Sequence, residues 1–158
     1  MECVNMIKHD PIGGALSLDA VWCVVPVYNN AATVREIVLG CRKYIHHVLV
    51  VDDGSTDMNV AELFAGTDIT VVKHAVNRGK GEALMTAAEY VNVHGGAFMV
   101  TIDADGQHYP DDIPSFIEDL HETAIVIGSR DFTVADVPRS SKFGLKFSNF
   151  WFRIETGL

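Results

Sequence analysis

The chain has 158 residues, of which 48% are hydrophobic; this suffices for one compact domain with a buried core and excludes a disordered or fibrous protein. The net charge of −9 argues against a general nucleic-acid-binding protein. No apolar run approaches the roughly 18 residues of a membrane-spanning helix, and residues 1–11 lack the apolar core of a signal peptide. We therefore expect a single domain over residues 1–158, located in the cytoplasm.

The three cysteines, Cys3, Cys23 and Cys41, lack the spacing of a metal site, and their odd number argues against a disulfide framework. Two of them lie in apolar, periodic surroundings. We therefore interpret them as small core residues of a protein in a reducing compartment.

The first half of the chain begins without a strong pattern over residues 1–18. Residues 20–27 form an apolar, β-branched run that predicts a buried strand. Thr33-Val34-Arg35-Glu36 has the pattern of a capping box and predicts the start of a helix whose apolar positions continue to Ile45. A second buried strand is predicted at residues 47–51.

Strands and helices continue to alternate in the rest of the chain. Further strands are predicted at residues 69–73, 98–102 and 124–127. Further helices are predicted at residues 60–64, after the glycine-containing loop 77–81, and from Asp111 and Asp112 onward. The alternation predicts an α/β fold, a three-layer sandwich in which helices cover both faces of a mostly parallel central sheet.

The predicted strand 98–102 stops at two carboxylates, in Asp103-Ala104-Asp105. Because these carboxylates are two positions apart, extended backbone directs them to the same side, and Gly106 allows a sharp turn after them. Two neighbouring carboxylates repel each other unless a cation lies between them, and hard cations such as Mg²⁺ or Mn²⁺ prefer such ligands. The alternative is an acidic strand end exposed to solvent.

Polar clusters follow several predicted strands at their carboxyl ends, where open α/β sheets bind ligands. They are Tyr28-Asn29, Asp52-Asp53-Gly54-Ser55, Asp103-Ala104-Asp105 and Ser129-Arg130. The first strand is not followed by G-x-G-x-x-G, and Gly79-Lys80-Gly81 lacks the length and the Ser/Thr of a Walker A sequence. These two differences argue against a dinucleotide site and a P-loop.

Four motifs together resemble those of the family 2 glycosyltransferases of the GT-A fold. They are Val25-Pro26-Val27-Tyr28-Asn29, Val51-Asp52-Asp53-Gly54-Ser55-Thr56-Asp57, Asn77-Arg78-Gly79-Lys80-Gly81-Glu82-Ala83-Leu84 and Asp103-Ala104-Asp105-Gly106-Gln107-His108. The last motif, together with Gly128-Ser129-Arg130 and the later Arg139, is most similar to the dolichyl- or polyprenyl-phosphate mannose and glucose synthases. The resemblance extends from about residue 21 to the last residue.

The resemblance implies a pocket for a UDP- or GDP-linked sugar. The implied nucleotide-binding residues are Pro26, Val27, Tyr28, Asp52, Asp53, Lys80, Asp103 and Ala104. Asp53 would hydrogen-bond the base with Asp52 beside it, although either carboxylate could instead cap the following helix. Lys80 would steady the diphosphate, and Arg78 is either a second such cation or a solvated side chain.

The resemblance also implies a divalent cation, Mg²⁺ or Mn²⁺, that bridges the diphosphate. Its implied ligands are Asp103, Asp105 and Gln107, because these ions favour oxygen donors. Asp105 is also an implied catalytic residue, and Asp103 would lie on the ribose or the metal side. His108 is interpreted as a neighbour rather than a ligand.

The implied reaction transfers a sugar, with inversion, from a nucleoside diphosphate to a polyprenyl phosphate. The acceptor oxygen is already anionic and needs cations rather than a general base, and Arg130 and Arg139 are the candidates, with Arg130 also an implied catalytic residue. The alternatives are a polysaccharide or other lipid-linked acceptor, or a fragment that binds a nucleotide sugar without turnover.

The chain from Arg139 onward carries a net charge of +3, whereas the remainder carries −12. Apolar residues recur there at helical spacing, at Phe143, Phe147, Phe150, Trp151 and Ile154. Such a segment suits either a peripheral position at the inner face of a membrane or packing on the domain's own core. Members of the family usually continue past Leu158, so we expect nucleotide binding to be more robust than turnover.

Overall fold

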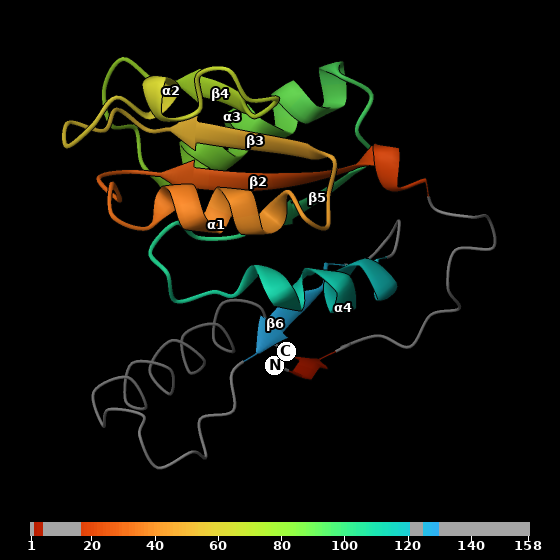
Figure 1. Ribbon diagram of the computed structural model, residues 1–158. Helices are drawn as coiled ribbons and strands as arrows, with labels where there is room; N and C mark the ends of the chain where they lie inside the picture. The colour runs from red at the N-terminus through yellow and green to blue at the C-terminus, as the bar shows by residue number, and fades with distance from the viewer. Residues whose placement is uncertain (1, 5–16, 121–124, 130–158) are drawn as a thin grey trace, which may run out of the picture. The chain divides into compact units, whose positions relative to one another are not determined.

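The structure is a computed structural model that describes residues 2–4, 17–120 and 125–129 (Figure 1). The chain divides into two compact units, one of residues 5–126 and one of residues 1–4 with 127–158. The described part contains no helix long and apolar enough to cross a membrane.

The larger unit contains a four-stranded sheet in which every neighbouring pair is parallel. Its strands, in the order in which they lie across the sheet, are β4 (Thr70–Lys73), β3 (His47–Asp52), β2 (Val21–Val27) and β5 (Phe98–Thr101). The central strand β2 is buried along nearly its whole length, as expected for a strand of a parallel sheet that is covered on both faces.

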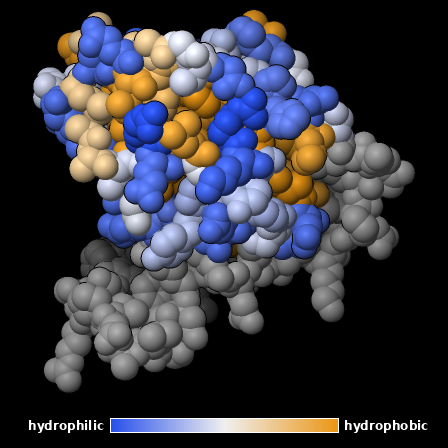
Figure 2. Space-filling model, in the orientation of Figure 1, coloured by the Kyte–Doolittle hydropathy of each residue, from blue (hydrophilic) through white to orange (hydrophobic). Residues whose placement is uncertain are grey.

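Within residues 17–120, four α-helices accompany this sheet. They are α1 (Val34–Cys41), α2 (Val60–Leu63), α3 (Lys80–Val93) and α4 (Ile113–Glu118), with short 3₁₀ turns at Leu18–Ala20 and Pro110–Asp112. Figure 1 shows α1 and α3 on opposite sides of the sheet. Hydrophilic side chains cover much of the outward face seen in Figure 2, with smaller hydrophobic areas between them.

The two faces of β2 contribute to two separate hydrophobic clusters, because successive side chains of a strand point to opposite faces. Val21, Cys23, Val25 and Val27 belong to a cluster with buried residues of α1, with Val60 of α2 and with Ile113 of α4. Trp22 and Val24 pack instead with Ala83, Ala87 and Val91 of α3. Helix, sheet and helix thus form three layers, which confirms the predicted α/β fold.

The smaller unit differs from the prediction. Its strand β6 (Ile127–Ser129) begins where the predicted strand 124–127 was expected to end, and it pairs antiparallel with β1 (Glu2–Val4), within a segment in which no element was predicted. A strand of three residues is too short to display an alternating pattern. Its pairing, Val4 opposite Ile127, joins segments that are 123 positions apart in the sequence.

The predicted helix that was to reach Ile45 also ends early, at Cys41. A turn follows, and the Ile45 amide still donates to the Cys41 carbonyl oxygen, 3.1 Å away. Ile45 is 1% exposed, so its apolar side chain reflects a place in the core rather than a continuing helix.

Pro26 opens the sheet at the carboxyl end of β2. Pairing of β2 with β5 ends at Val24 opposite Thr101, followed by one hydrogen bond from the Ile102 amide to the Val24 carbonyl oxygen (3.0 Å). Backbone groups of alternate strand residues point toward the same neighbouring strand, so those of Pro26, like those of Val24, point toward the β5 side. Because β5 has already ended at this level, the N–H that proline lacks would have no partner there. The strands after β2 extend to one side, through β3 and β4, and β5 lies on the other, so this gap is the topological switch point at which α/β sheets bind ligands.

Candidate functional site

A cavity of about 280 Å³ lies at this switch point. It is lined by Pro26, Val27, Tyr28, Asn30, Asp53, Asn77, Lys80, Ala83, Asp103, Ala104 and Asp105. Every residue predicted to bind the nucleotide, except Asp52, is therefore in one place, beside Asp105. These residues end or follow β2, follow β3 or β5, or lie in the loop before α3 and in its first turn, so the carboxyl ends of parallel strands bring them together.

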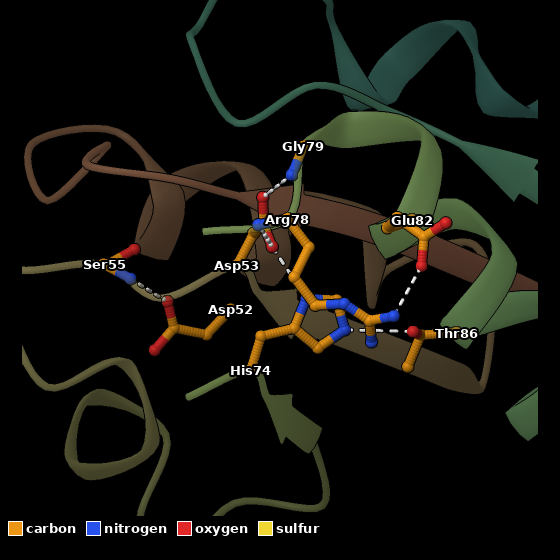
Figure 3. A network of polar contacts seen from close by, with 8 residues as sticks. All are labelled: Asp52, Asp53, Ser55, His74, Arg78, Gly79, Glu82 and Thr86. Atoms are coloured by element: carbon orange, nitrogen blue, oxygen red, sulfur yellow. Dashed lines mark hydrogen bonds and ion pairs between the residues drawn. The ribbon is translucent and has the colours of Figure 1, made fainter. Parts of the chain in front are cut away.

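Asp53 follows β3 and ties the loop before α3 to the sheet (Figure 3). Its Oδ1 accepts the Arg78 amide at 2.9 Å and lies 2.6 Å from Nδ1 of His74, and its Oδ2 accepts the Gly79 amide at 2.8 Å. His74 Nε2 lies 2.9 Å from the Thr86 hydroxyl oxygen of α3. A buried chain of polar contacts thus links Asp53, on the cavity wall, to the helix that begins at Lys80.

The surroundings of Asp53 act on its ionisation in opposite directions. Burial of the carboxyl group raises its pKa, because it disfavours the charged form. Hydrogen bonds from the Arg78 amide, the His74 ring and the Gly79 amide outweigh burial, and the pKa of Asp53 is lower than its ordinary value. Asp53 is therefore an ionised acceptor at neutral pH.

Asp52 is buried and does not line the cavity. Its side chain is fully buried, its Oδ1 accepts the Ser55 amide at 2.8 Å, and its Oδ2 lies 3.3 Å from Nζ of Lys73. Because α2 begins only at Val60, the contact to Ser55 closes a turn and does not cap a helix as the alternative interpretation expected. Its position fits a role in holding the turn that carries Asp53.

The loop after β2 is cross-linked to the turn after β3. The Asn29 amide donates to Oγ of Ser55 (3.1 Å), and the Thr56 amide donates to Oδ1 of Asn29 (2.9 Å). The Ala31 amide donates to Oδ2 of Asp57 (2.9 Å). These residues of the second motif hold the wall that presents Tyr28, and their side chains make contacts within the protein.

Lys80 and Asp103 meet across the cavity. Nζ of Lys80, the first residue of α3, lies 2.6 Å and 2.8 Å from the two carboxylate oxygens of Asp103. Arg78, the other predicted cation, pairs with Glu82 at 2.6 Å and does not line the cavity. Lys80 is thus the cation that the structure places at this site among the described residues.

The loop after β5 is fixed by an unexpected contact. The Thr33 hydroxyl donates to the Ala104 carbonyl oxygen and makes no capping hydrogen bond to α1. The predicted capping box is therefore wrong, because a tertiary acceptor takes the hydroxyl that the local pattern assigned to the helix. Gly106 supports the turn with φ +79°.

The predicted metal ligands lie along this loop. Asp105 is exposed and lines the cavity, and its Oδ1 accepts the Gln107 amide at 2.9 Å; Gln107 does not line the cavity. The described residues contain no cluster of three or more His, Cys, Asp or Glu side chains that could hold an ion by itself. Two carboxylates with an amide carbonyl nevertheless suit Mg²⁺ or Mn²⁺, which bind proteins through one or two carboxylates and take further oxygens from phosphates.

His108 lies beside this site, with its Nδ1 3.5 Å from the Asp103 amide nitrogen. His108 therefore lies next to Asp103, one of the predicted metal ligands. Arg130, Arg139 and the segment 139–158 lie outside the described residues, and Ser129 belongs to the smaller unit.

Several residues of the site were missed in the sequence. His74 and Thr86 complete the network of Asp53, and Asn30, Asn77 and Ala83 line the cavity. His74 directly follows β4, so the rule that polar residues at strand ends form sites could have identified it. Thr86 lies within α3 and has no such signal.

The sequence model of the family described as "Glycosyl transferase family 2" matches residues 22–155. An uncharacterised protein of Methanocaldococcus jannaschii is 30% identical over 92% of the chain and 63% of that protein. An undecaprenyl-phosphate 4-deoxy-4-formamido-L-arabinose transferase of Sodalis glossinidius is 30% identical over 87% of the chain and 41% of its own length.

A UDP-N-acetylglucosamine–dolichyl-phosphate N-acetylglucosaminyltransferase of Methanococcus voltae is 28% identical over 70% of the chain and 51% of its own length. The chain thus spans between about two fifths and two thirds of the length of these curated relatives.

Proposed function

The chain belongs to the glycosyl transferase family 2, and from this premise we propose that it binds a nucleoside-diphosphate sugar and transfers the sugar to a polyprenyl phosphate. One observation carries the proposal. Asp53, Lys80, Asp103 and Asp105, which come from three separate segments of the chain, line a single cavity at the switch point of the sheet.

The residues that line the cavity can contact both the base and the diphosphate of a nucleoside diphosphate. The carboxylate of Asp53 is an acceptor for the N–H of a base, and Pro26, Val27 and Tyr28 provide apolar and aromatic surface beside it. Lys80 is a cation for the diphosphate, which would compete with Asp103 for its ammonium group. Asp103 and Ala104 are proposed to contact the ribose.

A divalent cation is part of this proposal. Asp105, Asp103 and Gln107 would hold Mg²⁺ or Mn²⁺, which when bound neutralises the charge that develops on the leaving diphosphate. The exposed position of Asp105 leaves its carboxylate accessible from the cavity.

The proposed acceptor rests on the relatives, two of which are named for undecaprenyl or dolichyl phosphate. An acceptor phosphate oxygen would attack the anomeric carbon, the bond from that carbon to the diphosphate would break, and the diphosphate would leave with the electron pair. Arg130 and Arg139 are proposed to hold the acceptor phosphate. The basic segment 139–158 is proposed to bind the cytoplasmic surface of a membrane, whose anionic lipids attract basic segments.

A second candidate function is binding of the nucleotide sugar without transfer. It rests on the same cavity, because the residues proposed for the donor are described there, whereas Arg130 and Arg139, proposed for the acceptor, lie outside the described residues. Another lipid-linked glycan or a polysaccharide is the alternative acceptor.

Isothermal titration of the chain with UDP and GDP, with and without Mn²⁺, tests the proposed donor site. We expect one binding site, tighter with Mn²⁺, and loss of the Mn²⁺ effect in Asp105→Ala. Absence of binding by either nucleotide would refute the donor site, and equal affinity with and without Mn²⁺ would refute the metal.

Transfer assays with polyprenyl phosphate and with a polysaccharide acceptor then separate the acceptor classes. Transfer to the polyprenyl phosphate supports the proposed reaction. Nucleotide binding with no transfer to either acceptor supports the binding function.

A further inference from the structure

The acceptor capacity of Asp53 is nearly filled by the protein itself. A carboxylate offers about four lone-pair positions, two on each oxygen. The His74 ring and the Arg78 amide take both positions on Oδ1, and the Gly79 amide takes one on Oδ2. Among contacts with the described residues, one position, on Oδ2, remains for a ligand.

Access to Asp53 is correspondingly narrow. Its side chain is 5% exposed, yet it lines the cavity together with Lys80 and Asp103. A base reaching this carboxylate therefore meets one small window rather than an open pair of oxygens.

His74 is itself locked in place. Its side chain is 6% exposed, and because an ionised carboxylate accepts only, Nδ1 must carry the hydrogen that points at Asp53. In the neutral ring Nε2 then accepts from the Thr86 hydroxyl, 2.9 Å away. Figure 3 shows the ring beside Thr86. The His74 amide also donates to the Asp52 carbonyl oxygen at 2.8 Å, so both ring and backbone are held.

We propose that His74 is a specificity-determining positioning residue: by occupying Oδ1 of Asp53 it leaves room for one base N–H, which selects uridine over guanosine diphosphates. This inference rests on the proposed donor site. Uracil presents a single ring N–H, which matches the one remaining acceptor position. Guanine presents two adjacent donors, a ring N–H and an amino group, of which one would be buried without a partner at a cost in affinity.

Two substitutions of His74 separate its two ring nitrogens. The amide nitrogen of Asn is bonded to Cγ, as Nδ1 of His is, so His74→Asn retains a donor toward Asp53. The amide nitrogen of Gln takes the place of Nε2, so His74→Gln retains a group near Thr86 and frees one position on Oδ1. His46→Asn, at an exposed histidine outside the cavity, is the matched control.

Titration calorimetry with UDP and with GDP, at fixed Mn²⁺, gives the ratio of the two dissociation constants for each protein. We expect the wild-type chain to bind UDP at least about tenfold more tightly than GDP. His74→Asn and His46→Asn should keep the preference, and His74→Gln should bring the two constants to within about threefold.

The outcomes distinguish this inference from the proposed function. Equal or tighter binding of GDP by the wild-type chain overturns the inference and leaves the donor site standing, whereas failure of both nucleotides to bind overturns both. A merely structural His74 would lower the melting temperature of both His74 variants without changing the ratio, and that result also overturns it. If His74→Gln does not fold, the wild-type ratio of the UDP and GDP dissociation constants and the same ratio in Thr86→Val provide the test. Thr86→Val should weaken the preference for UDP, because the His74 ring loses its contact with the Thr86 hydroxyl.

Discussion

Nζ of Lys80 lies within 2.8 Å of both carboxylate oxygens of Asp103, although the two residues are 23 positions apart and belong to different walls of the cavity. The Lys80 side chain is 60% exposed and that of Asp103 is 29% exposed, so solvent screens the pair and it contributes little to stability. The pair instead holds the Lys80 ammonium group at the cavity, where a more strongly anionic ligand can replace Asp103 as its partner.

Replacing Lys80 should therefore affect ligand binding more than folding. We expect Lys80→Met to weaken UDP binding by about tenfold to a hundredfold, because a charge-assisted contact is lost, and to change the unfolding free energy by less than about 1 kcal/mol. Calorimetry and urea unfolding measure the two effects. Lys43→Met, at an exposed lysine outside the cavity, is the matched control, and unchanged affinity in Lys80→Met would show that Lys80 does not contact the ligand.

Gly54, directly after Asp53, is predicted to be intolerant of any side chain. Its φ is +75°, and an added Cβ would lie 2.6 Å from the Asn77 amide nitrogen and from the Val76 carbonyl carbon. Gly66 has nearly the same φ, +76°, but a Cβ added there would meet no atom within 4 Å among the described residues. Gly66→Ala therefore measures the energetic cost of the backbone conformation alone.

Measured by urea unfolding, the free energy of unfolding should fall by about 1 kcal/mol in Gly66→Ala and by about 3 kcal/mol or more in Gly54→Ala. Since the clash involves loop 76–77, Gly54→Ala should also weaken UDP binding. Equal costs for the two substitutions would mean that the loop is not packed on Gly54.

The sheet and the site were predictable for one common reason. Buried parallel strands appear in the sequence as continuous apolar runs, and their carboxyl ends meet at one edge, so Asp53 and Asp103 could be placed together without coordinates. The β1–β6 pair was not predictable in this way, because strands of three residues carry no periodicity and their pairing spans the sequence.

The incorrect and missing predictions within the site have a similar cause, because they concern contacts between residues far apart in the sequence. The hydroxyl of Thr33 fits a local capping rule, but its acceptor is Ala104, 71 positions away. His74 contacts Asp53 and Thr86, 21 and 12 positions away; its place after β4 indicates the edge of the sheet but not these two partners. Contacts between loops are decided by tertiary packing, which local patterns do not contain.

The contact of Thr33 with Ala104 leads to a test that also separates it from the capping box. Thr33→Val removes the hydroxyl and should cost about 1 kcal/mol in the free energy of unfolding, because the loop between Asp103 and Asp105 loses its tie to α1. Glu36→Ala, which removes the acceptor of the other half of the box at an exposed position, should change stability by less than about 0.5 kcal/mol. Equal losses in the two variants would restore the capping box, and Thr33→Ser should behave as wild type.

Asp53 should make stability depend on pH in the acid range. Because the pKa of Asp53 is lower in the folded protein, the unfolded chain binds its proton first as the pH falls. Its contribution is therefore complete above the unfolded value of about 3.9 and is lost as the pH falls through the lower, folded value.

Urea unfolding of wild type and Asp53→Asn at pH 7, 5, 4 and 3 checks this dependence. The difference between the two proteins should be constant from pH 7 to 5 and should shrink from about pH 4 downward. Asp19→Asn, at an exposed carboxylate, should stay within about 0.5 kcal/mol of wild type at every pH. A difference that grew on acidification would contradict an ionised Asp53 in the folded state.

Cys23 and Cys41 should be unreactive thiols in the folded protein. Both are free and 0% exposed, one on β2 and the other at the end of α1. The pKa of Cys23 is well above its ordinary value, first because of a hydrogen bond with Cys41, then because of burial and of the charge of Cys41. Low accessibility slows alkylation of both cysteines, and because the thiolate is the nucleophile, the raised pKa slows it further at Cys23.

Alkylation with iodoacetamide at pH 8, followed by peptide mapping, gives the rate at each of these cysteines separately. We expect Cys23 and Cys41 to remain unmodified in native buffer for as long as the protein stays folded, and to react at the rate of a free thiol in denaturing urea. Rapid native labelling of Cys23 would mean that the cluster between β2 and α1 opens readily. Because Cys23 lies on the same strand as Pro26, addition of UDP should slow any residual labelling if the nucleotide stabilises this sheet.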